Sequence, residues 1–121
     1  MHGRLGLVGV LLLVSSALLC GQGTPARRPD VRFLATPQNV VDAMLDFAQV
    51  TADDVVYDLG SGDGRIPIAA ARRFGARGVG IELDPRLVAE SDAAARREGV
   101  DSRVRFIAGD LFQADLHDAT V

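Results

Sequence analysis

The sequence predicts an α/β fold, a Rossmann-like parallel sheet with flanking helices, over residues 36–121. Helical and strand patterns alternate along this region, which is typical of a parallel sheet with right-handed crossovers. Each predicted strand also ends at or beside an acidic residue, and proline or glycine marks the helix ends. We expect about three strands, and because sheets average about five or six, residues 36–121 would be the N-terminal part of a longer domain.

The first predicted helix follows Thr36, which can cap it, with Pro37 in its first position. Apolar residues then recur at helical spacing: Val40, Met44, Phe47 and Ala48, with Val41 and Leu45 beside them. We expect this helix to cover the sheet.

Two further helices have clear ends. Residues 65–74 read as a helix with a proline in the opening turn and Gly75 as its stop. Asp84 and Pro85 repeat the signal of a cap followed by proline, and the helix that they begin should end near Gly99.

Three short apolar runs, at 55–58, 79–82 and 104–111, predict the strands, and 116–121 resembles the start of a fourth. The acidic residues at their ends are Asp58, Glu82 and Asp110. Each acid alone fits a helix cap or a solvated turn equally well. Open parallel sheets bind ligands at the carboxyl ends of their strands, so together the three acids would face one crevice.

The run Asp-Leu-Gly-Ser-Gly-Asp-Gly at 58–64 is the most informative motif. A side chain at Gly60 or Gly62 would occupy the space needed by a ligand that lies against bare backbone. A glycine-rich turn alone is also compatible with an ordinary strand-to-helix connection. A dinucleotide site needs a third glycine where this chain has Arg65, and a P-loop needs a lysine, which the chain lacks.

The ligand that fits an acid at this strand end is S-adenosylmethionine, which carries a sulfonium cation and an ammonium group and has no pyrophosphate. Glu82 lies 20 residues beyond Gly62, where an acid accepts ribose hydroxyls in nucleotide-binding βαβ units. Asp110 would accept from the adenine amino group while Leu111 packs on the ring.

These motifs resemble those of class I S-adenosylmethionine-dependent methyltransferases, over roughly residue 36 to the end. The sequence around them, including Thr36-Pro37 and Asp63-Gly64-Arg65, is similar to small membrane-associated protein-lysine methyltransferases. The resemblance implies that Asp58, Gly60, Ser61 and Gly62 line the methionine and ribose end. It also implies Glu82 at the ribose, Asp110 and Leu111 at the adenine, and a membrane protein as methyl acceptor.

No catalytic residue is identifiable, because methyl transfer from a sulfonium mainly requires alignment of the reactants. Histidine spacing suggests no metal. The net charge of −3 gives no general attraction to nucleic acid, so a nucleic-acid partner is not favoured. Alternatives to protein-lysine methylation are methylation of a small molecule or nucleic acid, and a protein that binds the cofactor without transferring methyl.

Residues 1–22 predict a signal peptide or membrane anchor that forms a hydrophobic helix, and 23–35 predict a linker. The apolar stretch 5–20 lies between the usual lengths of a signal-peptide core and a membrane span, so length does not decide between them.

The charges beside this stretch favour an uncleaved anchor. Arg27, Arg28 and Arg32 follow it whereas only Arg4 and the terminal amine precede it, which favours a cytoplasmic location for the domain. We therefore expect membrane association with a cytoplasmic domain. The alternative is export, through a cleaved signal peptide or as a lipoprotein anchored at Cys20.

Overall fold

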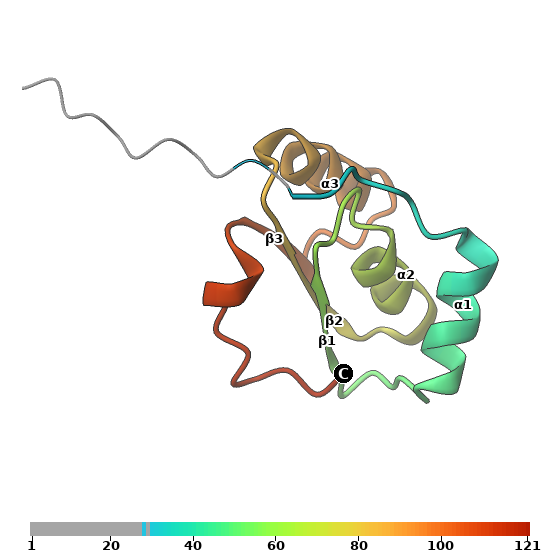
Figure 1. Ribbon diagram of the computed structural model, residues 1–121. Coiled ribbons are helices and arrows are strands. Elements are labelled where there is room, and N and C mark those ends of the chain that lie inside the picture. The colour runs from blue at the N-terminus through green and yellow to red at the C-terminus, as the bar shows by residue number, and fades with distance from the viewer. Residues whose placement is uncertain (1–27, 29) are drawn as a thin grey trace, which may run out of the picture.

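The computed structural model describes residue 28 and residues 30–121, and these form a three-stranded parallel sheet flanked by helices (Figure 1). The strands are β1 (Val55–Leu59), β2 (Arg77–Glu82) and β3 (Val104–Ala108), in the spatial order β1-β2-β3. This confirms the predicted Rossmann-like sheet. The predicted hydrophobic helix within residues 1–22 lies outside the described residues, and no helix in the described part has the length and apolar character needed to cross a membrane.

Two helix ends lie where local sequence signals predicted them. Helix α2 (Arg65–Phe74) ends at Gly75, which adopts the left-handed conformation with φ of 71°. Helix α3 (Pro85–Arg97) begins after Asp84, whose carboxylate accepts a hydrogen bond from the Arg86 amide at 2.9 Å. Helix α1 (Gln38–Phe47) precedes the sheet, and the short 3₁₀ helix η1 (Leu111–Gln113) follows it.

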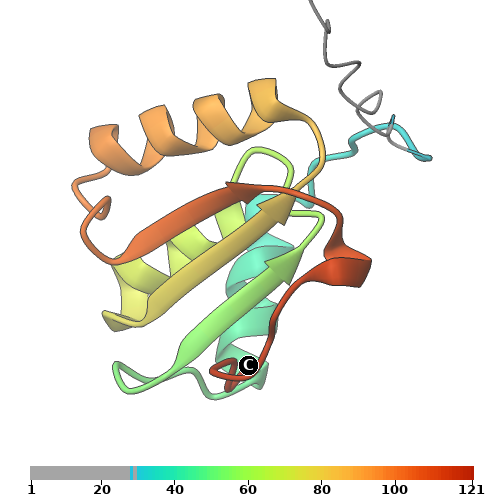
Figure 2. The same ribbon diagram turned by 90° about the vertical axis from the view of Figure 1, so that its left-hand side faces the viewer.

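Glycines in β2 allow α2 to lie close against the sheet. A Cβ at Gly78 would come within 2.7 Å of Pro67 in α2, and a Cβ at Gly80 would come within 2.5 Å of the Ser61 hydroxyl. The register pairs Asp58 with Gly80, so the end of β1 stands beside a position without a side chain. Helices α1 and α2 lie on one side of the sheet, and the segment after β3 lies on the other (Figures 1 and 2).

Helix α1 differs from its prediction at its start, and the structure selects one of its two apolar sides for burial. It begins at Gln38, so the cap position is occupied by Pro37 and not by Thr36. No side chain makes a capping hydrogen bond at this end of the helix. Its buried residues are Val41 and Leu45, which join a core cluster with β1 and α2. Val40, Met44 and Phe47, which also recur at helical spacing, are exposed. Because α1 has apolar residues on both sides, periodicity alone did not select the buried one.

The third strand is shorter than predicted, and the chain after it is irregular. β3 ends at Ala108, because Asp110 caps η1 by accepting a hydrogen bond from the Phe112 amide at 3.0 Å. At the other end of this segment, the Val121 amide donates to the Val55 carbonyl at 3.3 Å and the Val121 carbonyl accepts from the Tyr57 amide at 2.9 Å. This is the hydrogen-bond pattern of a parallel pair along the free edge of β1.

Candidate functional site

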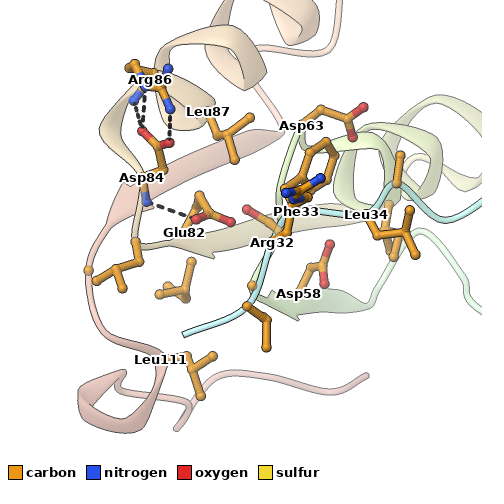
Figure 3. Close-up of a pocket in the computed structure, with 18 of the residues that line it drawn as sticks. Arg32, Phe33, Leu34, Asp58, Asp63, Glu82, Asp84, Arg86, Leu87 and Leu111 are labelled. Carbon is orange, nitrogen blue, oxygen red and sulfur yellow. Dashed lines mark hydrogen bonds and ion pairs between the residues drawn. The ribbon is translucent and has the colours of Figure 1, made fainter. Parts of the chain in front are cut away.

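A cavity of about 940 Å³ lies at the carboxyl end of the sheet (Figure 3). This volume is at the upper end of the range for small-molecule sites. Among the residues proposed from the sequence, those that line it are Asp58, Gly60, Ser61, Glu82, Asp110 and Leu111. The ends of all three strands therefore contribute to one cavity, as does the N-terminal stretch 30–36.

The turn after β1 owes its shape to three left-handed glycines, Gly60, Gly62 and Gly64, with φ values of 90°, 54° and 77°. A Cβ at Gly60 would meet no atom within 4 Å, so this glycine borders open space. A Cβ at Gly64 would come within 2.6 Å of the Phe106 ring, so this one allows the turn to pack on β3.

Glu82 holds this turn through its carboxylate. Its Oε2 accepts a hydrogen bond from the Gly62 amide at 2.9 Å, and its Oε1 accepts one from the Asp84 amide at 2.9 Å. The residue is buried, with 9% of its surface exposed. Each carboxylate oxygen retains a further lone pair for a ligand.

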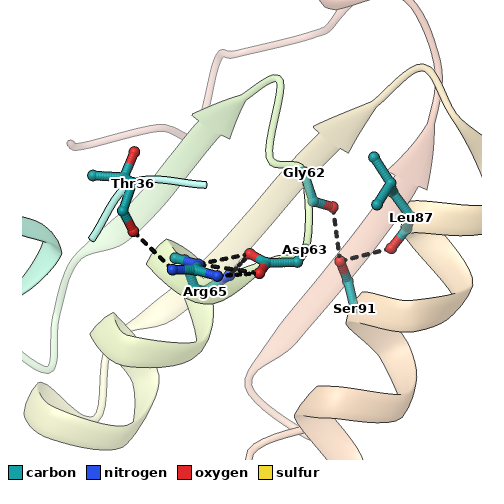
Figure 4. A network of polar contacts seen from close by, with 6 residues as sticks. All are labelled: Thr36, Gly62, Asp63, Arg65, Leu87 and Ser91. Carbon is teal, nitrogen blue, oxygen red and sulfur yellow. Dashed lines mark hydrogen bonds and ion pairs between the residues drawn. The ribbon is translucent and has the colours of Figure 1, made fainter. Parts of the chain in front are cut away.

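Ser91 of α3 holds the same turn from the other side. The hydroxyl of this fully buried residue lies 3.1 Å from the Gly62 carbonyl and 2.8 Å from the Leu87 carbonyl (Figure 4). The amide and the carbonyl of Gly62 are thus both fixed by later parts of the chain.

Asp58 has no comparable support, since its carboxylate receives no hydrogen bond from any described residue. The pKa of Asp58 is raised to about 6, chiefly by burial and in addition by the charges of Glu82 and Asp63. A carboxylate in this position gains most from a positively charged partner. The site therefore favours a cation next to Gly60.

Arg65 occupies the position where a dinucleotide-binding turn has its third glycine. Its guanidinium binds the Asp63 carboxylate, with the Nε atom 2.9 Å from Oδ1, and its Nη1 donates to the Thr36 carbonyl at 2.8 Å (Figure 4). The hydrogen bonds from Arg65 lower the pKa of Asp63. Arg65 thus ties the N-terminal stretch to the start of α2.

Gly62 differs from expectation because its open side is filled by protein. A Cβ at this position would overlap the ring of Phe33, and Gly62 does not line the cavity. We expected a ligand to require the space beside Gly62, whereas the structure places an aromatic side chain there. Figure 3 shows Phe33 beside the cavity, close to Asp63.

The end of the cavity at β3 is built by Asp110 and Leu111. Asp110 caps η1, and Leu111 packs on a cluster of Val55, Val79 and Ile81 on the face of the sheet away from the helices. The Ser61 hydroxyl is buried and has no hydrogen-bond partner within the described part of the chain.

Sequence reasoning missed three residues of this site: Phe33, Arg65 as an anchor, and Ser91. Ser91 carries a usable signal, because it is a polar residue among alanines on the buried side of a helix. Phe33 and Gly62 are 29 residues apart in the sequence, and Phe33 lies in an irregular stretch. No local sequence pattern therefore indicates their contact.

Comparison with known proteins identifies the family. Residues 58–121 match the ANTKMT methyltransferase domain. The protein-lysine N-methyltransferase of Saccharolobus islandicus is 43% identical over 94 residues, which cover 77% of this chain and 58% of that protein. A human lysine N-methyltransferase that is named for a subunit of ATP synthase is 38% identical over 109 residues, which cover 89% of this chain and 46% of that protein. The chain thus spans about half the length of the curated relatives that it matches.

A solved structure is similar over the same region. The RNA methyltransferase from Salinibacter ruber, crystallised with S-adenosyl-L-homocysteine, superposes with a TM-score of 0.71 at 57% identity, over 72% of this chain and 57% of that one. The match of the family model to more than half of the chain, together with this fold, shows that the chain belongs to the ANTKMT methyltransferase domain family.

Proposed function

We propose that the cavity binds S-adenosylmethionine and that the whole protein transfers its methyl group to a protein lysine. The observation that carries the first step is Asp58, a largely buried carboxylate without a hydrogen bond from the described chain, next to the open side of Gly60. A cationic ligand with little bulk at this point fits both features. Similar structures crystallised with S-adenosyl-L-homocysteine support the same cofactor.

The remaining residues fit the other parts of the cofactor. One lone pair on each Glu82 oxygen accepts from a backbone amide. The other lone pair on each oxygen can accept from one of the two ribose hydroxyls. Asp110 and Leu111 offer an acceptor and an apolar surface for the adenine. When bound, S-adenosylmethionine supplies a methyl group on an activated sulfonium. The chain's part is to orient the cofactor and exclude water, and we assign no catalytic residue.

Isothermal titration with S-adenosylhomocysteine tests the binding step. We expect the wild-type chain to bind and Asp58→Ala to bind at least about tenfold more weakly, since it loses a charge-assisted contact. A wild-type chain that is folded by circular dichroism and does not bind would overturn the proposal.

The relatives support a lysine as the methyl acceptor. Several of them are named as lysine N-methyltransferases, and one of these names gives a subunit of ATP synthase as the protein that is methylated. The test incubates the whole protein with purified ATP synthase and S-adenosylmethionine labelled in the methyl group. Label in a methylated lysine, located by mass spectrometry and absent with Asp58→Ala, is the expected result.

RNA is the second candidate acceptor. It is favoured by the Salinibacter ruber RNA methyltransferase, whose structure is 57% identical over the matched region. Ribosomal RNA offered in the same assay separates the two candidates. Label in RNA and none in ATP synthase would replace the lysine assignment.

We further propose that residues 1–22 are an uncleaved anchor that places the domain at the cytoplasmic face of a membrane. The apolar stretch 5–20 and the arginines after it support this. Mature protein that begins after residue 20 and is found in an exported fraction would contradict it.

A further inference from the structure

The N-terminal stretch 30–36, here called the strap, lies across the glycine turn and contributes one wall of the cavity. Its Phe33 ring covers Gly62 so closely that a Cβ there would overlap it. Phe33 as a whole residue is nevertheless 44% exposed, and it lines the cavity. One part of this side chain is therefore packed against the turn, and another part is open to a ligand.

The strap is held in this position by polar contacts at its C-terminal end. Arg65 donates to the Thr36 carbonyl at 2.8 Å, and Arg65 is itself fixed by the Asp63 carboxylate. Both Asp63 and Arg65 belong to the turn and to the start of α2, so the strap and the turn form one structural unit. Phe33 lies three residues before this anchor.

The position of the ring relative to the charges defines its role. Asp58 and Glu82 line the cavity from the strand ends, and the strap lines it from the other side of the turn. Phe33 and Asp58 thus line the same cavity, and Asp58 has no hydrogen bond from the described residues. An apolar side chain beside a carboxylate lowers the local dielectric and strengthens the attraction of the carboxylate for a cation. The ring also offers apolar surface to the part of the ligand next to the turn.

We propose that Phe33 is a cofactor-positioning residue, which closes the methionine end of the S-adenosylmethionine site by packing on Gly62. The inference rests on the proposed cofactor site. It assigns a binding role to a residue outside the Asp-x-Gly-x-Gly motif and outside the three strand ends. Entry and release of the cofactor then depend on the strap.

The test measures the dissociation constant and the dissociation rate of S-adenosylhomocysteine for the wild-type chain and for Phe33→Ala, Phe33→Leu and Phe47→Ala. Phe33→Ala should weaken binding about tenfold or more, mainly through faster dissociation, because a large apolar contact is lost. Phe33→Leu should recover most of the affinity. Phe47→Ala is the matched control, since Phe47 is 91% exposed on α1, and it should bind as the wild type does.

A double-mutant cycle with Arg65→Ala separates positioning from general stability. If Arg65 acts on the ligand by holding the strap, Arg65→Ala should weaken binding in the wild-type background and have little further effect in Phe33→Ala. Independent, additive losses would overturn the link between the anchor and the ring.

The outcomes also separate this inference from the proposed function. A folded wild-type chain that fails to bind would overturn both. Binding by the wild type that is weakened by Asp58→Ala but unchanged in Phe33→Ala would overturn the role of Phe33 alone. Tighter binding by Phe33→Ala would show that the ring blocks the site, which also contradicts the inference.

Discussion

The carboxyl ends of β1 and β2 carry carboxylates that face the same cavity and differ in almost every other respect. Both oxygens of Glu82 accept hydrogen bonds from backbone amides, at Gly62 and Asp84, and the residue is buried. Asp58 has no hydrogen bond from the described chain, and its pKa is raised to about 6, chiefly by burial. Backbone amides therefore hold the carboxylate at the end of β2, whereas no hydrogen bond from the described residues holds the one at the end of β1.

This difference assigns separate tasks to two residues that look alike in the sequence. Glu82 shapes the turn and so stabilises the fold, in addition to its proposed contact with the ribose, while the role proposed for Asp58 is binding, at some cost in stability. Substitutions at the two positions should thus change the free energy of unfolding in opposite directions.

The largest effect is expected for Glu82→Gln. The substitution replaces one acceptor oxygen by a donor NH₂ group that faces a backbone amide, which should lower the free energy of unfolding by about 2–4 kcal/mol. Urea denaturation without ligand measures it. Glu98→Gln is the control, because it removes only an exposed ion pair with Arg72 and should change the value by less than about 1 kcal/mol. An unchanged stability in Glu82→Gln would show that this carboxylate does not hold the turn.

Asp58→Asn should change the free energy of unfolding in the opposite direction. At pH 7.5 it removes a partly buried negative charge, so the free energy of unfolding should rise by about 1–2 kcal/mol while the affinity for S-adenosylhomocysteine falls about tenfold. Denaturation and titration calorimetry on the same samples provide both values. A variant that loses both stability and affinity would contradict the division of tasks.

The raised pKa of Asp58 should make ligand binding at the end of β1 depend on pH. Between pH 3.8 and about 6 the folded chain retains the Asp58 proton that the unfolded chain releases, so the contribution of Asp58 to stability falls as the pH rises through this window. The ammonium group, which S-adenosylhomocysteine shares with S-adenosylmethionine, would bind the ionised form of Asp58. The affinity should therefore rise with pH over the same window and fall by up to about tenfold per unit below pH 6. Titrations of S-adenosylhomocysteine from pH 5 to 8 test this, and Asp58→Asn should flatten the profile. A wild-type profile as flat as that of the variant would refute the assignment.

The smallest effect is expected for Ser91→Ala. One hydroxyl proton is shared between two carbonyls, so its loss should cost about 1 kcal/mol and weaken the hold on Gly62 from the α3 side only. Ser102→Ala, at an exposed position, is the control for denaturation. A loss as large as that of Glu82→Gln would mean that α3 fixes the turn as strongly as β2 does, which would contradict this order of effects.

The sequence predicted well those parts of the fold that depend on local signals. The ends of α2 and α3 follow from Gly75 and from Asp84-Pro85, and the parallel order follows from the alternation of elements. The spacing did not select the buried side of helix α1, since Val40 and Val41 both have apolar partners at helical spacing. Tertiary packing decides which side of such a helix is buried, and the apolar pattern of one helix carries no information about that packing.

The candidate site was predictable in its strand ends and not in its surroundings. Asp58, Glu82 and Asp110 could be placed together because parallel strands bring their carboxyl ends to one edge. The different states of Asp58 and Glu82 could not be predicted, because they depend on which backbone amides lie within hydrogen-bonding distance. The contact of Phe33 with Gly62 could not be predicted, because it depends on the path of an irregular stretch whose sequence has no periodicity.

The clamping of Gly62 has a consequence for how the site forms. Its amide is bound by a residue 20 positions later and its carbonyl by one 29 positions later, so the turn gains its shape only after β2 and α3 have docked. Formation of the binding surface is therefore coupled to the folding of this whole part of the chain. By mass action, a ligand that recognises the finished turn raises the melting temperature of the entire unit, which makes thermal shift a direct screen for the natural cofactor.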